Sequence, residues 1–146
     1  MLFVTELLHN HLLLSALCGW AAAQVLKTII FAVSNRGVDW SRLMGDGGMP
    51  SGHSATVCAL AASAGLEYGV SSAYFGITTV LGIIVMHDAM GVRLEAGKHA
   101  QALNELRELL DSDREPEEKL KELLGHTPLQ VFAGGTLGIA VAFLLQ

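Results

Sequence analysis

A long apolar segment near the start of the chain most restricts what the chain can fold into. The segment runs from about Leu12 to Val33, and the strongly polar side chains inside it are those of Gln24 and Lys27. A helix of about 20 apolar residues spans the ~30 Å hydrocarbon core of a bilayer. The segment therefore predicts a membrane helix, with Lys27 near one end, where a cation can reach the interface or face a polar interior.

Three more apolar segments follow, at 51–68, 73–86 and 128–146. Charged residues make up only 16% of the chain, whereas soluble domains carry about a quarter. The 16 glycines suit helices that pack closely in lipid. We expect an all-α fold: an integral membrane helical bundle with about four membrane helices plus interfacial helices, formed by residues 1–146 as a single domain.

The basic residues indicate an orientation in the membrane. All nine Lys and Arg lie in two windows, 27–42 and 93–121, and the turn at 69–72 has none. With four spans the two windows share one side of the bilayer, which the positive-inside rule assigns to the cytoplasm. We therefore expect a protein of the inner or plasma membrane, with its polar site on the cytoplasmic side.

The tetrapeptide Pro50-Ser51-Gly52-His53 lies at the start of the second apolar segment and carries polar groups that a membrane span does not need. Free N–H groups and the dipole at a helix start favour an anion. Ser51 adds a hydroxyl donor, Gly52 lets the backbone approach a ligand, and His53 can protonate a leaving oxygen. The pattern predicts a cradle for phosphate or another oxyanion. A helix cap beside an incidental histidine explains the tetrapeptide about equally well.

Other ionisable residues are expected at the same side of the bilayer, where charges are costly and are candidates for function. Two or three bases can hold a phosphate dianion. Two histidines can divide the roles of nucleophile and acid, and a carboxylate can orient one imidazole. The residues concerned are Lys27, Arg36, Asp88, Arg93 and His126.

Four segments, in order along most of the chain, carry a resemblance to a known family. They are residues 47–55, with the tetrapeptide above, then 88–93, 96–104 and 123–128. With them the chain resembles the divergent, short-chain branch of the type-2 phosphatidic acid phosphatase and vanadium haloperoxidase superfamily. The resemblance implies a helical phosphate-binding protein, and the superfamily's phosphatases form a phospho-histidine and need no metal.

The resemblance also implies roles by position. His53 resembles the family's acid, Lys27 and Arg36 its first-motif bases, and Arg93 its third-motif arginine. The spacing departs from the family pattern, because eight residues rather than six separate Lys27 from Arg36. Val92 also stands where the third motif has serine.

The identity of the nucleophile stays open between His99 and His126. His99 has the third-motif distance from the arginine, but Leu103 stands where that motif has aspartate. We favour His126, which lies in the rigid turn Gly-His-Thr-Pro, and we expect Asp88 to replace the missing aspartate as the orienting carboxylate. His99 is then an exposed polar residue.

These patterns predict a membrane phosphatase-like protein that hydrolyses or transfers phosphate or diphosphate on a lipid-like substrate through a phospho-histidine. The main alternative is a non-catalytic protein that binds or transports phosphate or anionic lipid. A vanadate-dependent oxidation enzyme and a purely structural bundle are further alternatives. Asp46 could bind a cation, but support of its glycine-rich turn is the simpler role. We expect no metal and no cofactor. The expected partners are a phosphorylated lipid or prenyl phosphate and the membrane, with no nucleic acid and with a homodimer left open.

Overall fold

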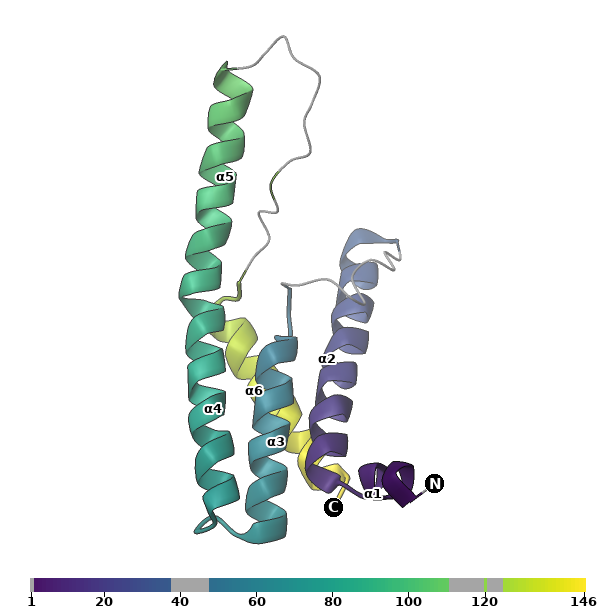
Figure 1. Cartoon of the computed structure of the whole chain (residues 1–146). Coiled ribbons are helices and arrows are strands. Elements are labelled where there is room, and N and C mark those ends of the chain that lie inside the picture. Colours follow the sequence, from purple (N-terminus) through teal and green to yellow (C-terminus); the bar gives the residue numbers. More distant parts are fainter. Residues whose placement is uncertain (1, 38–47, 111–119, 121–124) are drawn as a thin grey trace.

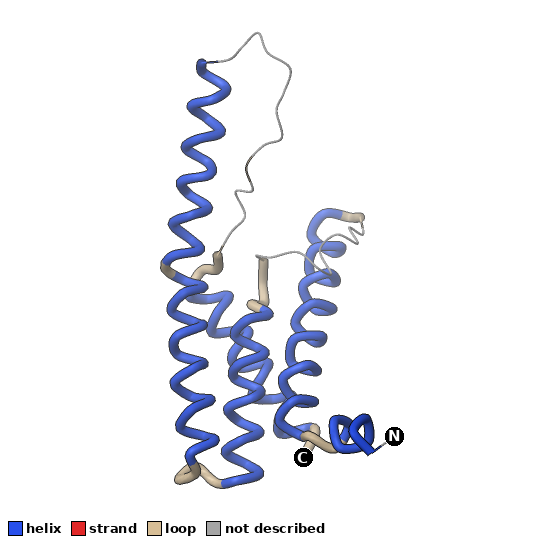
Figure 2. The backbone as a smooth tube through the Cα atoms, viewed as in Figure 1, coloured by secondary structure: helices blue, strands red, loops and turns tan. Residues whose placement is uncertain are grey.

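The computed structural model describes residues 2–37, 48–110, 120 and 125–146, and its regular elements there are all helices (Figures 1 and 2). The prediction of an all-α membrane bundle is confirmed. Asp46 and residues 111–119 and 121–124 lie outside the described residues. The helices are α1 (Leu2–Leu8), α2 (His11–Asn35), α3 (Gly52–Tyr68), α4 (Ala73–Met90), α5 (Val92–Leu110) and α6 (Pro128–Leu144).

Helix α3 is the centre of the bundle, and α2, α4 and α6 all pack against it. Figure 1 shows that α2 and α4 run in one direction and α3 and α6 in the other, so that both termini lie at one end. The opposite end of the bundle consequently holds the ends of α2 and α4 and the starts of α3 and α6. This second end, which we call the inner end, holds the polar residues discussed below.

Small residues allow α3 to be surrounded on several sides. A Cβ at Gly19 of α2 would lie 2.9 Å from the carbonyl oxygen of Ala55, and a Cβ at Gly138 of α6 would collide with that same oxygen from another side. Gly134 approaches the Ser51 carbonyl oxygen just as closely. Gly134 and Gly138, spaced as Gly-x-x-x-Gly, therefore form the face of α6 that packs on α3, as such pairs do in membrane bundles.

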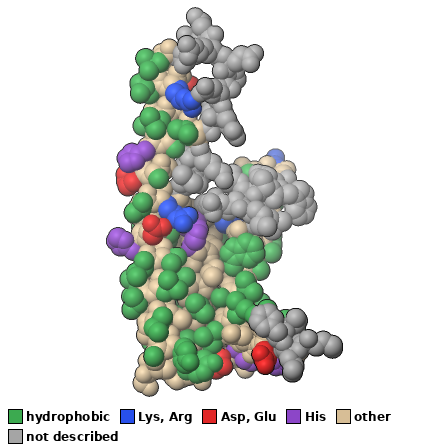
Figure 3. Space-filling model, in the orientation of Figure 1, with side chains coloured by type: hydrophobic (Ala, Val, Ile, Leu, Met, Phe, Trp, Pro, Cys, Tyr) green, Lys and Arg blue, Asp and Glu red, His purple; other side chains and the backbone are tan. Residues whose placement is uncertain are grey.

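The distribution of side chains is the reverse of that in a soluble domain. The largest side chains with less than 2% exposure are serines, whereas soluble cores are filled by large apolar residues. Large apolar side chains point outward from the three outer helices, with Ile29 52%, Ile84 60% and Phe132 75% exposed. Figure 3 shows hydrophobic side chains over much of the bundle surface, with charged side chains and histidines in the upper half and at the lower edge. Such a surface suits lipid.

Two helices are long and apolar enough to cross a membrane: α2, and the α4 part of the continuous stretch Ala73–Leu110. Helix α6 is apolar but has 17 residues, about 25 Å of helix. Helix α3 also has 17 residues and is rich in Ala and Ser, because its neighbours rather than lipid cover much of it. The sequence expectation of about four membrane helices thus corresponds to four bundle helices, of which two meet the length and hydropathy of a span.

Helix α5 continues the direction of α4 beyond the other helices (Figure 1). It carries an exposed ion pair in which Lys98 Nζ lies 2.7 Å from Glu95 Oε1. The hydrogen bond from Lys98, and then its charge, lower the pKa of the Glu95 carboxyl from its usual value. Ion pairs of this exposure are typical of a helix in water, so we assign α5 to the aqueous side of the inner end.

Candidate functional site

The start of α3 is built as a capped helix terminus within the bundle. The Ser51 hydroxyl accepts hydrogen bonds from the Ser54 backbone N–H, at 3.3 Å, and from the Ser54 hydroxyl, at 3.0 Å. Ser51 is fully buried, as is Ser54. The hydroxyl that the sequence suggests as a ligand donor therefore serves as the cap of α3.

The start of α6 presents a second capped terminus, directly after His126. Thr127 and Gln130 form a reciprocal capping box, and Pro128 occupies the first helical turn. His126 is only 3% exposed, and its backbone N–H donates to the Ala89 carbonyl oxygen at 2.9 Å. Gly125 has a φ of +80°, and a Cβ there would collide with the backbone of Leu94. Only glycine fits this position, so Gly125 allows His126 to dock on the end of α4.

The two capped termini are joined to each other. The Ser51 backbone N–H donates to the Gln130 carbonyl oxygen at 3.0 Å. His53 follows the Ser51 cap, and His126 precedes the Thr127 cap. The centroids of their rings lie 5.8 Å apart, at an interplanar angle of 57°. The structure thus brings together the two histidines that the sequence suggests as acid and nucleophile. One small ligand can contact both rings.

One face of α2 runs past the start of α3. Trp20, Gln24 and Lys27 follow one another at helical spacing, which places them on the same side of α2. The indole of Trp20 and the amide of Gln24 lie 3.6 and 3.8 Å from where a Cβ of Gly52 would be. Lys27 is only 5% exposed, and a Cβ at Gly48 would lie 3.4 Å from its aliphatic stem. A buried cation on this face, beside the segment that leads into α3, favours an anion.

Asp88 and Arg93 form an ion pair across the junction of α4 and α5. Arg93 Nε lies 2.9 Å from Asp88 Oδ2, and the two side chains are 47% and 44% exposed. Asp88 directly precedes Ala89, which holds the backbone of His126. Among the described residues, the carboxylate of Asp88 thus pairs with a proposed phosphate-binding base. Its sequence-derived role as the carboxylate that orients an imidazole stays a prediction.

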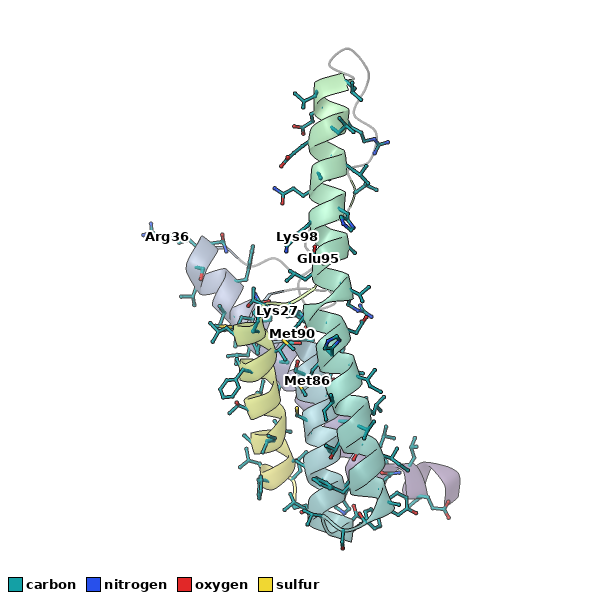
Figure 4. The ribbon with its side chains drawn as sticks, turned by 90° about the vertical axis from the view of Figure 1, so that its left-hand side faces the viewer. Lys27, Arg36, Met86, Met90, Glu95 and Lys98 are labelled. Carbon is teal, nitrogen blue, oxygen red and sulfur yellow. The ribbon has the colours of Figure 1, made fainter. Side chains whose placement is uncertain are left out.

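Two sequence-predicted residues lie away from this cluster. Arg36 is the exposed residue after α2, with a φ of +52°, and in Figure 4 it projects from the far end of that helix while Lys27 lies at the level of Met90. The structure therefore does not bring Arg36 to the cluster that holds Lys27. His99 is exposed on α5, in agreement with its expected place as an exposed polar residue.

Gln24 belongs to the site by position, although it is absent from the sequence-predicted site residues. It is 6% exposed and faces the start of α3. The signal was present in the sequence, because a polar residue within an apolar run, three positions before Lys27, shares the helix face of that lysine.

The arrangement combines a buried lysine, two neighbouring histidines and two helix N-termini at the inner end. The carboxylate of Asp88, at the rim of this arrangement, pairs with Arg93. Within the described ranges, no three His, Cys, Asp or Glu side chains gather as a metal-binding group. Chemically, the cluster can bind an oxyanion and offer it a nucleophilic nitrogen and a proton donor.

The fold and the cluster define a helical membrane protein with a histidine-containing polar site at one end of its bundle. The chain belongs to the Divergent PAP2 family, whose model matches residues 8–141. It is also similar to the "Uncharacterized membrane protein YuiD" of Bacillus subtilis (strain 168). The identity is 42% over an alignment of 152 positions, which covers 96% of each chain. No solved structure matches the chain. The family resemblance expected from the sequence motifs is confirmed.

Proposed function

We propose that this membrane protein hydrolyses or transfers a phosphate or diphosphate group on a lipid-like substrate through a phospho-histidine. The observation that carries the proposal is the approach of His53 and His126 to 5.8 Å between two helix N-termini. A structural bundle needs neither the second imidazole nor two capped termini directed to one place. Membership of a PAP2-related family supports the same chemistry.

The chemistry divides between the two imidazoles. A neutral ring nitrogen of His126 attacks phosphorus, and the bond between phosphorus and the substrate alcohol oxygen breaks. His53, as an imidazolium, gives its proton to that leaving oxygen. Neutral His53 then takes a proton from water as the water attacks phosphorus, so that the phosphorus–nitrogen bond breaks and phosphate leaves. An acceptor alcohol in place of water turns hydrolysis into transfer.

Phosphate binding comes from Lys27 and from the first-turn N–H groups of α3, with Arg93 as a further base at the rim. Lys27 is buried and Arg93 is exposed, which places one cation inside and one outside the cluster. Arg93 must exchange its contact with Asp88 for the phosphoryl oxygens. Such an exchange is inexpensive, because exposed ion pairs contribute only about 0–1 kcal/mol.

The position of the site suggests a substrate that reaches it from the bilayer. The apolar outer faces of α2, α4 and α6 lead up to the inner end, where the cluster lies beside the water-exposed α5. A phosphorylated lipid or prenyl phosphate fits both environments. The basic residues Lys27, Arg93 and Lys98 lie toward this end, so the positive-inside rule favours a cytoplasmic location.

The test is phosphate release by the full chain in detergent or liposomes, with EDTA present. Phosphatidic acid, prenyl phosphates and prenyl diphosphates are compared for wild type, His53→Ala and His126→Ala. Release that persists in EDTA and falls by about 100-fold or more in both variants, the usual size of acid–base contributions, supports the proposal. Full activity in His126→Ala would exclude His126 as the nucleophile.

A non-catalytic phosphate or anionic-lipid binding function is the second candidate, and the Asp88–Arg93 ion pair favours it. The carboxylate that would orient a nucleophile is occupied by a base instead, while an anion site still has Lys27 and the helix termini. The same assay separates the two functions. Absence of release from every substrate, together with stabilisation of the fold by phosphate or vanadate, would favour binding without turnover.

A further inference from the structure

The side-chain amide of Gln24 is a buried polar group that the proposed chemistry does not use. Gln24 lies on α2, one turn after Trp20 and one turn before Lys27, and is 6% exposed. Its Oε1 lies 3.8 Å from where a Cβ of Gly52 would be, and the Trp20 ring lies 3.6 Å from the same point. The amide therefore faces the first residue of α3, where the anion cradle begins.

The oxygen of this amide is buried and has no hydrogen-bond partner among the described residues. The backbone carbonyl of Gln24 is satisfied separately, by the Thr28 hydroxyl at 2.9 Å. A buried acceptor that has lost water without gaining a partner is costly. Such an atom beside a helix N-terminus is explained if a ligand supplies the partner.

We infer that Gln24 is a ligand-binding residue whose amide hydrogen-bonds an oxygen of the phosphoryl group held at the start of α3. Oε1 accepts a hydrogen bond, so its partner is a protonated phosphoryl oxygen, whereas the N–H groups of the amide can donate to an unprotonated one. Gln24 adds a hydrogen bond to the site without adding charge next to Lys27. The inference rests on the proposed function, because it requires a phosphoryl ligand at this terminus.

Ser63 provides a matched control. Its hydroxyl is also fully buried and also lacks a hydrogen-bond partner among the described residues, but it lies about three turns further along α3. Thr28→Val is a second control, since Thr28 is a buried polar residue one turn from Gln24. If burial of an unsatisfied group were the only role of Gln24, Gln24→Met and Ser63→Ala would behave alike.

The experiment measures how strongly two ligands, inorganic phosphate and a short-chain phosphatidic acid, bind the purified full chain in detergent. Binding is followed by the ligand-dependent rise in Tm. Gln24→Met is expected to weaken phosphate binding about tenfold or more, as loss of a hydrogen bond to a charged group does. Ser63→Ala and Thr28→Val are expected to bind as wild type does. Loss of both ligands in Gln24→Met assigns the contact to the phosphoryl group. Loss of the lipid alone assigns the contact to the diacylglycerol part of the lipid and overturns the inference.

A second variant covers the case in which Gln24→Met does not fold. Gln24→Asn keeps the amide but withdraws it by one methylene, and it is expected to weaken phosphate binding in the same direction. Wild-type phosphate affinity in either folded variant would overturn the inference and leave the proposed function standing. Failure of wild type itself to bind phosphate or vanadate would overturn both.

Discussion

The backbone N–H of Ser51 donates a hydrogen bond to the carbonyl oxygen of Gln130, at 3.0 Å, and so joins the capped starts of α3 and α6. This bond holds together the two helix ends that carry His53 and His126. It forms only because Gly134, one turn along α6, lets the two backbones approach. Helix packing and the geometry of the histidine pair are therefore coupled.

Gly134→Ala tests this coupling. The new Cβ collides with the Ser51 carbonyl oxygen, so α6 must move away from α3 and the two rings must separate. We expect a loss of about 1–3 kcal/mol in the free energy of unfolding, the usual cost of overpacking, together with a fall in phosphate release. Thermal unfolding and the release assay measure the two effects. Gly76→Ala is the control, since a Cβ there meets nothing within 4 Å. Equal losses of stability and of phosphate release in both variants would contradict the prediction.

Gly125→Ala should disturb His126 without touching the helix interfaces at α3. The position has a φ of +80°, and the added Cβ collides with Leu94, so the turn must lift from the junction of α4 and α5. Left-handed backbone alone costs an alanine about 1–2 kcal/mol. We expect phosphate release to fall further than stability does, because the hydrogen bond from His126 to Ala89 is displaced. In Gly37→Ala, where the added Cβ meets only a carbonyl oxygen at 3.9 Å, both quantities should stay at wild-type values.

Asp88→Asn tests whether the Asp88–Arg93 pair restrains a phosphate-binding arginine. Removal of the carboxylate charge should change the free energy of unfolding by no more than about 1 kcal/mol, because both side chains are about half exposed and exposed pairs contribute little. Phosphate affinity should rise, since Arg93 no longer has a competing anion. Arg93→Gln should lower it. Phosphate-dependent Tm shifts at low salt measure both, and weaker binding in Asp88→Asn would mean that Asp88 supports the site directly.

Gly52→Ala separates the ligand space from the fold. A Cβ at this position makes ordinary contacts of 3.6–3.9 Å with Trp20 and Gln24, so the bundle should keep its Tm. The methyl group nevertheless occupies the space between Gln24 and the start of α3. We expect phosphate affinity to fall by about tenfold, equivalent to ~1.4 kcal/mol. Unchanged affinity at unchanged Tm would show that the ligand does not lie between these residues.

Local properties of the chain were sufficient to predict the all-α membrane fold. Hydropathy over 12–33 and 73–86 predicts helices that lipid can surround, and Ser51 and Pro128 indicate helix starts. Each of these features depends on residues within a few turns of one another. The preference for His126 over His99 as the candidate nucleophile also depended on a short motif, Gly-His-Thr-Pro, beside a helix start.

The contacts between helices were decided only by the tertiary structure. Helical spacing places Gln24 on the face of Lys27, but only the packing of α2 on α3 brings its amide to Gly52. The turn at Gly91 brings Asp88 to Arg93, a contact that the sequence did not predict. Arg36 resembles a first-motif base with altered spacing, and it ends α2 away from the cluster. The physical reason is that hydropathy and capping depend on residues close together in the sequence. Contacts between side chains of different helices depend instead on how closely the helices pack. The glycine contacts of Gly19, Gly134 and Gly138 with α3 set that packing, and they join residues far apart in the sequence.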